Sequence, residues 1–428
     1  MADQTIRVSS YTGGIVGPHL EMLGPVADGG TIVAETAPGC WGPIITPHFR
    51  GGHEVTQPVA VAGAEVGDAV AIRIQSVRIR SRASASGTSR MIEGRRFTGG
   101  PLVTTRCPGC GAENPRTVLT GVGAEAIRCA RCGAAAIPAE MINGYTMVFD
   151  AERSLGLTVG PRAAAEIAHR AAEYAALPPD STQHSVLTLA RADLPGILAR
   201  VRPLVGNVGT TPAVQVGDSA NRGAWARFGQ DDGDGDPLTD AHMDIDSVRE
   251  GAIVLCPVKV RGGGVYVGDV HAMQGQGEIA NHTTDVSAEV TLRVEVVKGL
   301  ALEGPIVLPP VEDLPPLARP WTESEREAGR RLATEWGVAP EETAPIQVVG
   351  SGQSVDAAIG CALERAARLL GMSLDEVRNR ATITGSVEIG HTGMAKVTLL
   401  APLPILDRLG IGRFAAEQYG ARPERETG

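Results

Sequence analysis

Two pairs of cysteines are spaced for a metal site. Cys107 and Cys110 flank Pro-Gly, and after eighteen intervening residues Cys129 and Cys132 flank Ala-Arg. Two cysteines separated by two residues on a tight turn point both thiolates at one centre, and two such pairs complete the tetrahedral coordination of Zn²⁺. Four thiolates leave no position for water, so the spacing predicts a structural zinc that folds a small insert. A redox pair or a nucleic-acid finger is the alternative reading.

A second set of ligand types lies further along the chain. His242 and Asp244 are one residue apart, as are Asp269 and His271, and Glu278 follows. Residues i and i+2 of an extended strand point to one face, so each pair can present two ligands to one cavity. The pattern indicates a site for one or two metal ions. The alternative is that these are solvated turn residues. The candidate active-site metal ligands are His242, Asp244, Asp269 and His271.

The segment from Gly268 to Glu278 reads GDVHAMQGQGE. It resembles the signature of the acetamidase/formamidase family, G-D-x-H-A-x-Q-G-D-G-E. Residues 30–36 resemble an early strand of that family, and residues 53–68 resemble its H-P-L-T-G-P-I-x-V-x-G-A-x-P-G-D segment. The resemblance implies an α+β, strand-rich β core with a C-terminal helix pair, interrupted here by the zinc-ribbon insert. It also implies hydrolysis of the C–N bond of small amides, with metal bound near the G-D-x-H segment.

Three positions depart from the family pattern. Gln276 stands where the family usually has Asp, His242 stands where its G-G-N-M-D has Asn, and Asp285 falls where a Glu is expected. The loss of one carboxylate and the gain of an imidazole imply an altered ligand set, and hence an altered metal or substrate. We therefore expect a divergent member, whose substrate could be a lactam or a carbamate as well as a simple amide.

The chemistry expected of these residues is hydrolysis by metal-activated water. A divalent metal, expected to be zinc, lowers the pKa of bound water from about 15.7 to about 7 and polarises the amide carbonyl, so no covalent nucleophile is needed. Glu278 is the candidate general base and later proton donor to the leaving amine, or alternatively a residue that fixes His271. The predicted catalytic residues are Glu278, His271 and Asp269. Three residues are predicted to bind substrate: His53, which is alternatively a metal ligand or a turn residue, and Glu35 and Gln274, which alternatively support the metal ligands.

Serine and cysteine nucleophiles are disfavoured. The chain has no G-x-S-x-G motif. Cys256 lies within an apolar strand pattern and Cys361 within a helix, where inert thiols are the default, and Cys40 on a turn stands alone. From a different class, the chain could be a non-catalytic binding or assembly protein on a degenerate amidase scaffold, with the zinc ribbon as its docking element. A metal count separates the two: about one zinc per chain means the ribbon alone, and two or more mean a second site.

Short strands between Gly- and Pro-containing turns must position these residues. Alternation and β-branched content predict strands at 31–35, 59–62, 69–80, 252–260, 265–267, 286–297, 381–389 and 394–400. Helices are predicted at 161–177, at 354–370 with Ser354 as N-cap, and from a capping box at Ser373. Loops or surface crossings are predicted at 81–100, 206–235 and 308–320.

Length, charge and composition bound the function. The 428 residues allow one large domain or two to three ordinary ones. The net charge of −10 gives no positive field for a nucleic acid. The chain shows no run of eighteen apolar residues and no secretion signal, so we expect no membrane partner and a cytoplasmic location with reduced cysteines. The expected partners are a small amide, water and further copies of the chain in a homo-oligomer.

The predicted organisation places the insert inside one catalytic core. The segments are an N-terminal β-rich part at 1–102, the ribbon insert at 103–137, the remainder of the core at 138–420 with the metal segment at 240–285, and a disordered tail at 421–428.

Overall fold

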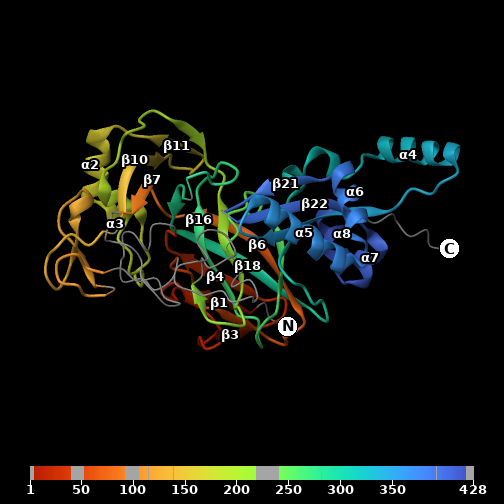
Figure 1. The fold of residues 1–428 in the computed structure, drawn as a ribbon, viewed down its shortest axis with the longest axis horizontal. Coiled ribbons are helices and arrows are strands. Elements are labelled where there is room, and N and C mark those ends of the chain that lie inside the picture. Colours follow the sequence, from red (N-terminus) through yellow and green to blue (C-terminus); the bar gives the residue numbers. More distant parts are fainter. Residues whose placement is uncertain are drawn as a thin grey trace.

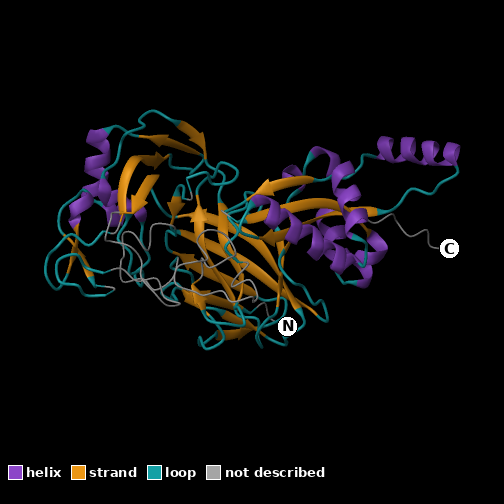
Figure 2. Cartoon of the chain, viewed as in Figure 1, coloured by secondary structure: helices purple, strands orange, loops and turns teal. Residues whose placement is uncertain are grey.

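The computed structural model describes residues 4–39, 53–91, 106–113, 115–137, 139–217, 241–280, 282–391 and 393–420. Strands dominate the middle of the molecule, and helices gather at its two ends (Figures 1 and 2). Among the described residues, no helix is both long and apolar enough to cross a membrane. The predicted tail at 421–428 and Cys40 lie outside the described residues.

The largest sheet has nine strands, and all but one of its neighbouring pairs are antiparallel. Its centre is formed by two long strands that pair over ten positions and alternate between buried and partly exposed residues, as a half-buried strand should. In spatial order the strands are β1 (Thr5–Val8), β4 (Thr31–Thr36), β18 (Ala288–Val297), β6 (Ala69–Ile79), β15 (Ile253–Pro257), β19 (Ile306–Leu308), β20 (Thr343–Ser351), β22 (Met394–Pro402) and β21 (Ser386–Ile389).

A second sheet packs against one half of the first. Its strands are β13 (Leu204–Thr210), β16 (Val265–His271), β5 (Val59–Val61) and β3 (Leu23–Val26), with β17 (Asp285–Val286) also paired to β16. Every residue of β13 and β16 is buried, because both faces of this sheet are covered. A core of Val, Ile and Ala side chains from both sheets fills the space between them. A short ribbon pairs β2 (Ile15–Val16) with β14 (Val216–Gly217).

A third sheet forms a separate lobe together with two short helices and the cysteine-containing insert, seen in yellow and orange in Figure 1. Its strands are β12 (Leu198–Arg200), β11 (Leu155–Thr158), β10 (Ala139–Phe149) and β7 (Ala83–Met91). The helical turns are α2 (Pro161–His169), α3 (Ala171–Ala175), η1 (Ala124–Ala126) and η2 (Val186–Leu189). The insert contributes a hairpin of β8 (Thr117–Leu119) and β9 (Ile127–Cys129).

Helices cover the other half of the large sheet. They bury apolar side chains against β20 and β22 in a second core. One helix, α4, is exposed along nearly all of its length and projects from the body in Figure 1. The elements are α4 (Glu323–Trp336), α5 (Val355–Leu370), α6 (Leu374–Thr384), α7 (Leu403–Arg408) and α8 (Gly412–Tyr419), with η4 (Val311–Asp313) and η5 (Pro316–Ala318).

Sequence patterns located most of these elements. The helix after Ser354 and the strands at 31–35, 59–62 and 69–80 are confirmed, with Ser354 accepting a hydrogen bond from the Ala357 amide. The single helix at 161–177 is wrong, because Arg170 has φ −120° and divides it into α2 and α3.

Three further expectations are wrong in part. Residues 381–384 complete α6 instead of starting a strand, and β21 begins only after Gly385 ends the helix. Residues 83–91 form β7, because partners from β10 cover a segment whose Ser- and Gly-rich composition suggested a loop. Residues 206–210 belong to the buried strand β13 for the same reason.

Candidate metal centre

The central strand β16 carries Asp269 and His271. The backbone of Asp269 is left-handed, with φ +52°, so the two side chains do not follow from simple strand alternation. Gly206 of the neighbouring strand lies level with Asp269. A Cβ atom at Gly206 would stand 2.2 Å from Asp244 Oδ1 and 2.7 Å from the Asp269 carbonyl oxygen. The absence of a side chain at Gly206 therefore leaves the room that both aspartates occupy.

The segment that carries His242 and Asp244 runs along the other side of β13. The Met243 and Asp244 amides both donate to the Gly206 carbonyl, at 2.8 and 3.1 Å. Asp244 also has a left-handed backbone, with φ +45°. These contacts bring the 242–244 segment and β16 together on either side of β13. The sequence predicted that the two ligand pairs would share one cavity, but it did not predict the strand that lies between them.

Six side chains from four separate parts of the chain meet at this point. His242 Nε2 lies 2.8 Å from Asp244 Oδ2 and 3.5 Å from Asp269 Oδ2. His53 Nε2 lies 3.5 Å from the same Asp269 oxygen, and His271 Nε2 lies 3.2 Å from Asp269 Oδ1. Their exposed fractions are between 0 and 3%. We call this set the buried cluster; its members are His53, His242, Asp244, Asp269, His271 and His391.

His391 is the member that sequence reasoning missed. It lies in the turn between β21 and β22, its amide donates to the Met243 carbonyl at 2.9 Å, and its ring centroid is 4.2 Å from that of His242. Gly390 permits this approach, because a Cβ atom there would stand 2.0 Å from the Met243 carbonyl oxygen. The only signal in the sequence was a histidine in a Gly-His-Thr-Gly segment, which does not by itself distinguish a ligand from a turn residue.

The donor atoms of the buried cluster fit a divalent cation. They form three overlapping triads in which all ligand atoms lie within 4.8 Å of one another: His53, His242 and Asp269; His242, Asp244 and His391; Asp244, Asp269 and His271. Within the described part of the chain, both oxygens of Asp244, Oδ2 of Asp269 and Nε2 of His242 make no hydrogen bond of acceptable geometry, although they face one another closely. Buried polar atoms are normally satisfied, so these atoms are placed for a ligand that they share.

Burial and opposite charge act against each other here. Burial alone would lower the pKa of His271, but the Asp269 carboxylate outweighs it and holds that pKa well above its usual value. Burial together with the charge of His242 lowers the pKa of His391 to about 3, so this imidazole is neutral at pH 7. The cluster thus combines aspartates whose pKa values are lowered with at least one neutral imidazole.

Glu278 lies at the edge of this centre with 4% exposure and a left-handed backbone, φ +40°. Burial raises the pKa of its carboxyl well above the usual value, and the charge of Asp244 raises it further. A carboxyl with a raised pKa takes up a proton more readily than an exposed carboxyl does, which suits a group that must accept a proton and return it.

Gln274 and Asp285 contact the two different ring nitrogens of His271. His271 Nδ1 lies 2.8 Å from Gln274 Oε1, and the Gln274 amide nitrogen donates to the Asp244 carbonyl at 2.5 Å and to Asp246 at 3.2 Å. Asp285 Oδ1 lies 3.2 Å from His271 Nε2. The side-chain oxygen and nitrogen of Gln274 are therefore both hydrogen-bonded within the protein, and Gln274 links the segment of His271 to the segment of Asp244.

The other predicted residues fall outside the cluster. Glu35 lies on β4 opposite Glu289 with an exposed side chain, and the structure does not bring it to the buried cluster. Gln276 is exposed on a turn. The four cysteines, in contrast, meet at a second point: their sulfur atoms lie within 4.8 Å of one another.

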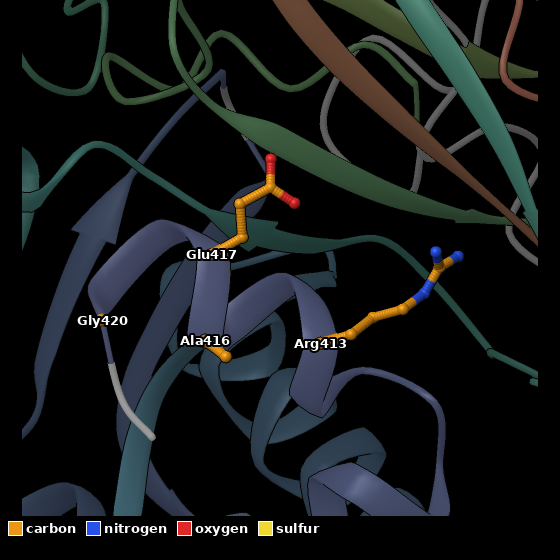
Figure 3. A pocket seen from close by; sticks show the side chains of 4 residues that line it. All are labelled: Arg413, Ala416, Glu417 and Gly420. Carbon is orange, nitrogen blue, oxygen red and sulfur yellow. The ribbon is translucent and has the colours of Figure 1, made fainter. Parts of the chain in front are cut away.

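A surface hollow of about 370 Å³ on α8 belongs to neither centre. It is lined by Arg413, Ala416, Glu417 and Gly420 (Figure 3). Arg413 pairs with Glu295, and Glu417 pairs with Arg73, so its charged groups already have partners.

Comparison with known proteins agrees with the fold. The chain is similar to the crystal structure of a recombinant predicted acetamidase/formamidase from Thermoanaerobacter tengcongensis, with 17% identity and a TM-score of 0.53 over 95% of this chain and 98% of that one. It is also similar to an acetamidase from Yersinia enterocolitica, with 15% identity and a TM-score of 0.53 over 94% of this chain and 93% of that one. At these identities the likeness concerns the fold.

Sequence comparison is more specific. The "Putative formamidase" of Schizosaccharomyces pombe is 33% identical over 84 residues, which span 18% of this chain and only 20% of that protein. The family model described as "Acetamidase/Formamidase family" matches residues 36–230 and 236–408. That match spans most of the chain and both ligand segments, so the chain belongs to the acetamidase/formamidase family.

Proposed function

We propose that this protein is a metal-dependent hydrolase that cleaves the C–N bond of a small amide, or of a related lactam or carbamate. Membership of the family makes it a hydrolase of C–N bonds other than peptide bonds. The single observation that supports the metal-dependent mechanism is the buried cluster, in which six histidine and aspartate side chains converge with almost no solvent exposure.

The residues that would hold the metal are those of the buried cluster. His242, Asp244 and Asp269 each belong to two of the three triads, so the cluster has enough donors for one or two ions. The mixture of imidazole and carboxylate suits zinc. A bound divalent cation supplies Lewis acidity, which lowers the pKa of water and polarises a carbonyl.

The protein residues supply positioning and proton transfer. Gln274 accepts from His271 Nδ1, which leaves Nε2 directed at the centre. Glu278 is our candidate for accepting a proton at its carboxylate and returning it to the leaving nitrogen, because its pKa is raised by burial. Of the three departures from the family pattern, His242 is one of the donors, Asp285 lies 3.2 Å from His271 Nε2, and Gln276 is exposed.

The cysteine cluster is proposed to hold a structural zinc. Its two turns repeat one hydrogen-bond pattern: the Gly111 amide donates to the Cys107 carbonyl at 2.9 Å, and the Gly133 amide donates to the Cys129 carbonyl at 2.8 Å. Both glycines have positive φ, 70° and 74°, which lets each turn close tightly. Four thiolates complete a tetrahedral set, so this site would contribute to folding and not to the reaction.

The test combines a metal count with an activity panel. We expect at least two metal ions per chain, release of ammonia or an amine from some member of an amide, lactam and carbamate panel, and loss of that release on chelation. Asp269→Asn should lower the rate by at least about 100-fold and reduce the metal content. Asp375→Asn is the matched control, because Asp375 is an exposed residue on α6 that pairs only locally with Arg378.

Inactivity on the whole panel at full metal occupancy would instead favour a non-catalytic binding or assembly protein on an amidase scaffold. Activity that survives complete removal of metal would refute the metal-dependent mechanism.

A further inference from the structure

A small cavity of about 20 Å³ lies beside the buried cluster, between the third sheet and its helical turns. Asp285, whose Oδ1 is 3.2 Å from His271 Nε2, forms one wall. Pro38 forms another, and its neighbour Gly39 is so close to Asp269 that a Cβ atom there would stand 1.8 Å from Oδ1. The cavity therefore adjoins the buried cluster at two points: through Asp285 next to His271, and through Pro38, whose neighbour Gly39 lies against Asp269.

Small apolar side chains make up most of the remaining wall. Ala83 and Ala85 come from β7, Ala175 from the end of α3, and Val186 and Leu187 from η2. Methyl groups from three elements thus limit the cavity to about one or two non-hydrogen atoms. A larger group would have to displace these buried side chains.

One wall residue is polar and unsatisfied. Gln183 lines the cavity with 5% exposure, and its side-chain nitrogen Nε2 has no hydrogen-bond partner among the described residues. Buried amide donors are nearly always paired, because an unpaired one loses the hydrogen bonds that it made with water. This donor is therefore available to an acceptor atom in the cavity.

The segment around Gln183 is held in place from both ends. The Glu54 carboxylate accepts from the Ser181 hydroxyl at 2.6 Å and from the Thr182 amide at 2.9 Å, and Glu54 directly follows the cluster residue His53. On the other side, His184 Nε2 lies 2.8 Å from Thr117 Oγ1 of the insert. The position of Gln183 is thus tied both to the metal-centre segment and to the cysteine-containing insert.

We propose that this cavity is the subsite for the substituent on the acyl carbon of the substrate, and that Gln183 donates a hydrogen bond to an oxygen atom on that substituent. The favoured substrates are amides with one small oxygen-bearing group, of which 2-hydroxyacetamide is the simplest. This inference rests on the proposed amide hydrolysis. Gln183 and Ala85 would be the specificity residues, and neither belongs to the buried cluster.

The test uses an isosteric pair, 2-hydroxyacetamide and propionamide, which differ by a hydroxyl in place of a methyl group. We expect the wild-type protein to have the higher kcat/KM for 2-hydroxyacetamide. Gln183→Leu should reduce the ratio of the two values by at least about fivefold while metal content stays the same. Ala85→Val should lower kcat/KM for both amides relative to formamide, which has no substituent. Ala328→Val on the exposed helix α4 is the control.

Two outcomes would overturn the subsite. An unchanged ratio in Gln183→Leu would mean that Gln183 binds only a structural water, and unchanged selectivity in Ala85→Val would place the substituent elsewhere. Should the wild-type protein hydrolyse no amide, the proposed function fails separately. Calorimetric titration with the same two amides then still tests the subsite, because equal affinity for both contradicts it.

Discussion

Single residues at this centre adopt backbone conformations that the rest of the chain mostly avoids. Of six non-glycine residues with positive φ among those described, three belong to the site: Asp244, Asp269 and Glu278. Such conformations cost about 1 to 3 kcal/mol each and persist only where surrounding contacts impose them. Three carboxylates are thus held in strained positions, which is what a preorganised cation and proton-transfer site requires.

Gly206 is the residue on which this arrangement depends most directly. Gly206→Ala would place a Cβ atom 2.2 Å from Asp244 Oδ1, so the aspartates must shift. We expect at least about a tenfold loss of metal affinity at the buried cluster and a comparable loss of amide hydrolysis. Metal competition titrations and steady-state rates measure both.

The control is Gly360→Ala in α5, where a Cβ atom has open space around it and should slightly stabilise the helix. Retention of full metal affinity in Gly206→Ala would contradict the role assigned to that glycine.

At the scale of elements, the insert supports the segment that lines the cavity. Ile127 of β9 packs with Val186 and Leu187 of η2, and the Gly123 amide donates to the Thr188 carbonyl at 2.7 Å. The apolar core around the cysteines of the insert is small, so the order of the insert should depend on the zinc proposed to join its two turns. The two metal centres would then be coupled mechanically, although they share no ligand.

Cys107→Ser tests this coupling. We expect the loss of one metal ion per chain, faster proteolysis within the insert, and a higher KM with a smaller change in kcat, because the Gln183 segment loosens while the buried cluster stays intact. Cys361→Ser in α5 provides the matched control, since Cys361 lies apart from the four-cysteine group. An unchanged metal count would refute the four-thiolate site.

The turn between β10 and β11 shows how a carboxylate stabilises an element. Asp150 accepts from the Ser154 and Leu155 amides at 2.7 and 2.8 Å. These hydrogen bonds, led by the one from Leu155, lower the pKa of Asp150 from 3.8 to about 2. A carboxyl with a depressed folded-state pKa stabilises the fold above its unfolded pKa, and this contribution is lost as the pH falls through the folded value.

Asp150→Asn should therefore flatten the dependence of stability on pH between about 4 and 2. Urea unfolding midpoints at pH 2, 3, 4 and 7 measure it. The effect should be small, because Asp150 is solvent-accessible, and equal slopes in the variant and the wild type would remove Asp150 from the acid response.

Two cores share one large sheet in the whole molecule. One core lies between the large sheet and the β13–β16 sheet and includes Met243 and Val270 next to members of the buried cluster, whereas the other lies under α5, α6, α7 and α8. Figure 1 shows these helices gathered at one end of the large sheet. The helical end should therefore contribute stability without taking part in the chemistry.

Phe414→Ala tests whether the core under the helices contributes stability alone. Phe414 is fully buried in the second core, with the guanidinium of Arg413 4.2 Å from its ring centroid. We expect a loss of about 3 to 5 kcal/mol in the free energy of unfolding, with metal content and KM unchanged in the folded fraction. A loss of metal at temperatures where the variant remains folded would show that the two cores are coupled.

Local patterns predicted those parts of the fold whose signals are local. Ser354 and Gly371 bound α5 as expected because caps act within one turn, and β6 showed its alternation in the sequence. Long-range pairing decided the rest: β7 and β13 are strands because neighbouring strands satisfy their backbones, although their compositions suggested loops.

The sequence by itself determined which chemistry was available: four cysteines at a spacing that suits zinc, a GDVHAMQGQGE segment, and two pairs of ligand residues one residue apart. Only the tertiary structure decided which residues belong to the buried cluster and which do not. It brought His391 and His53 to Asp244 and Asp269 from distant parts of the chain, left Glu35 exposed, and placed Gln183 at a cavity beside Asp285. The physical reason is that ligand convergence depends on strand register, on left-handed aspartates and on glycines that leave room. None of these three has a periodic signature along the chain.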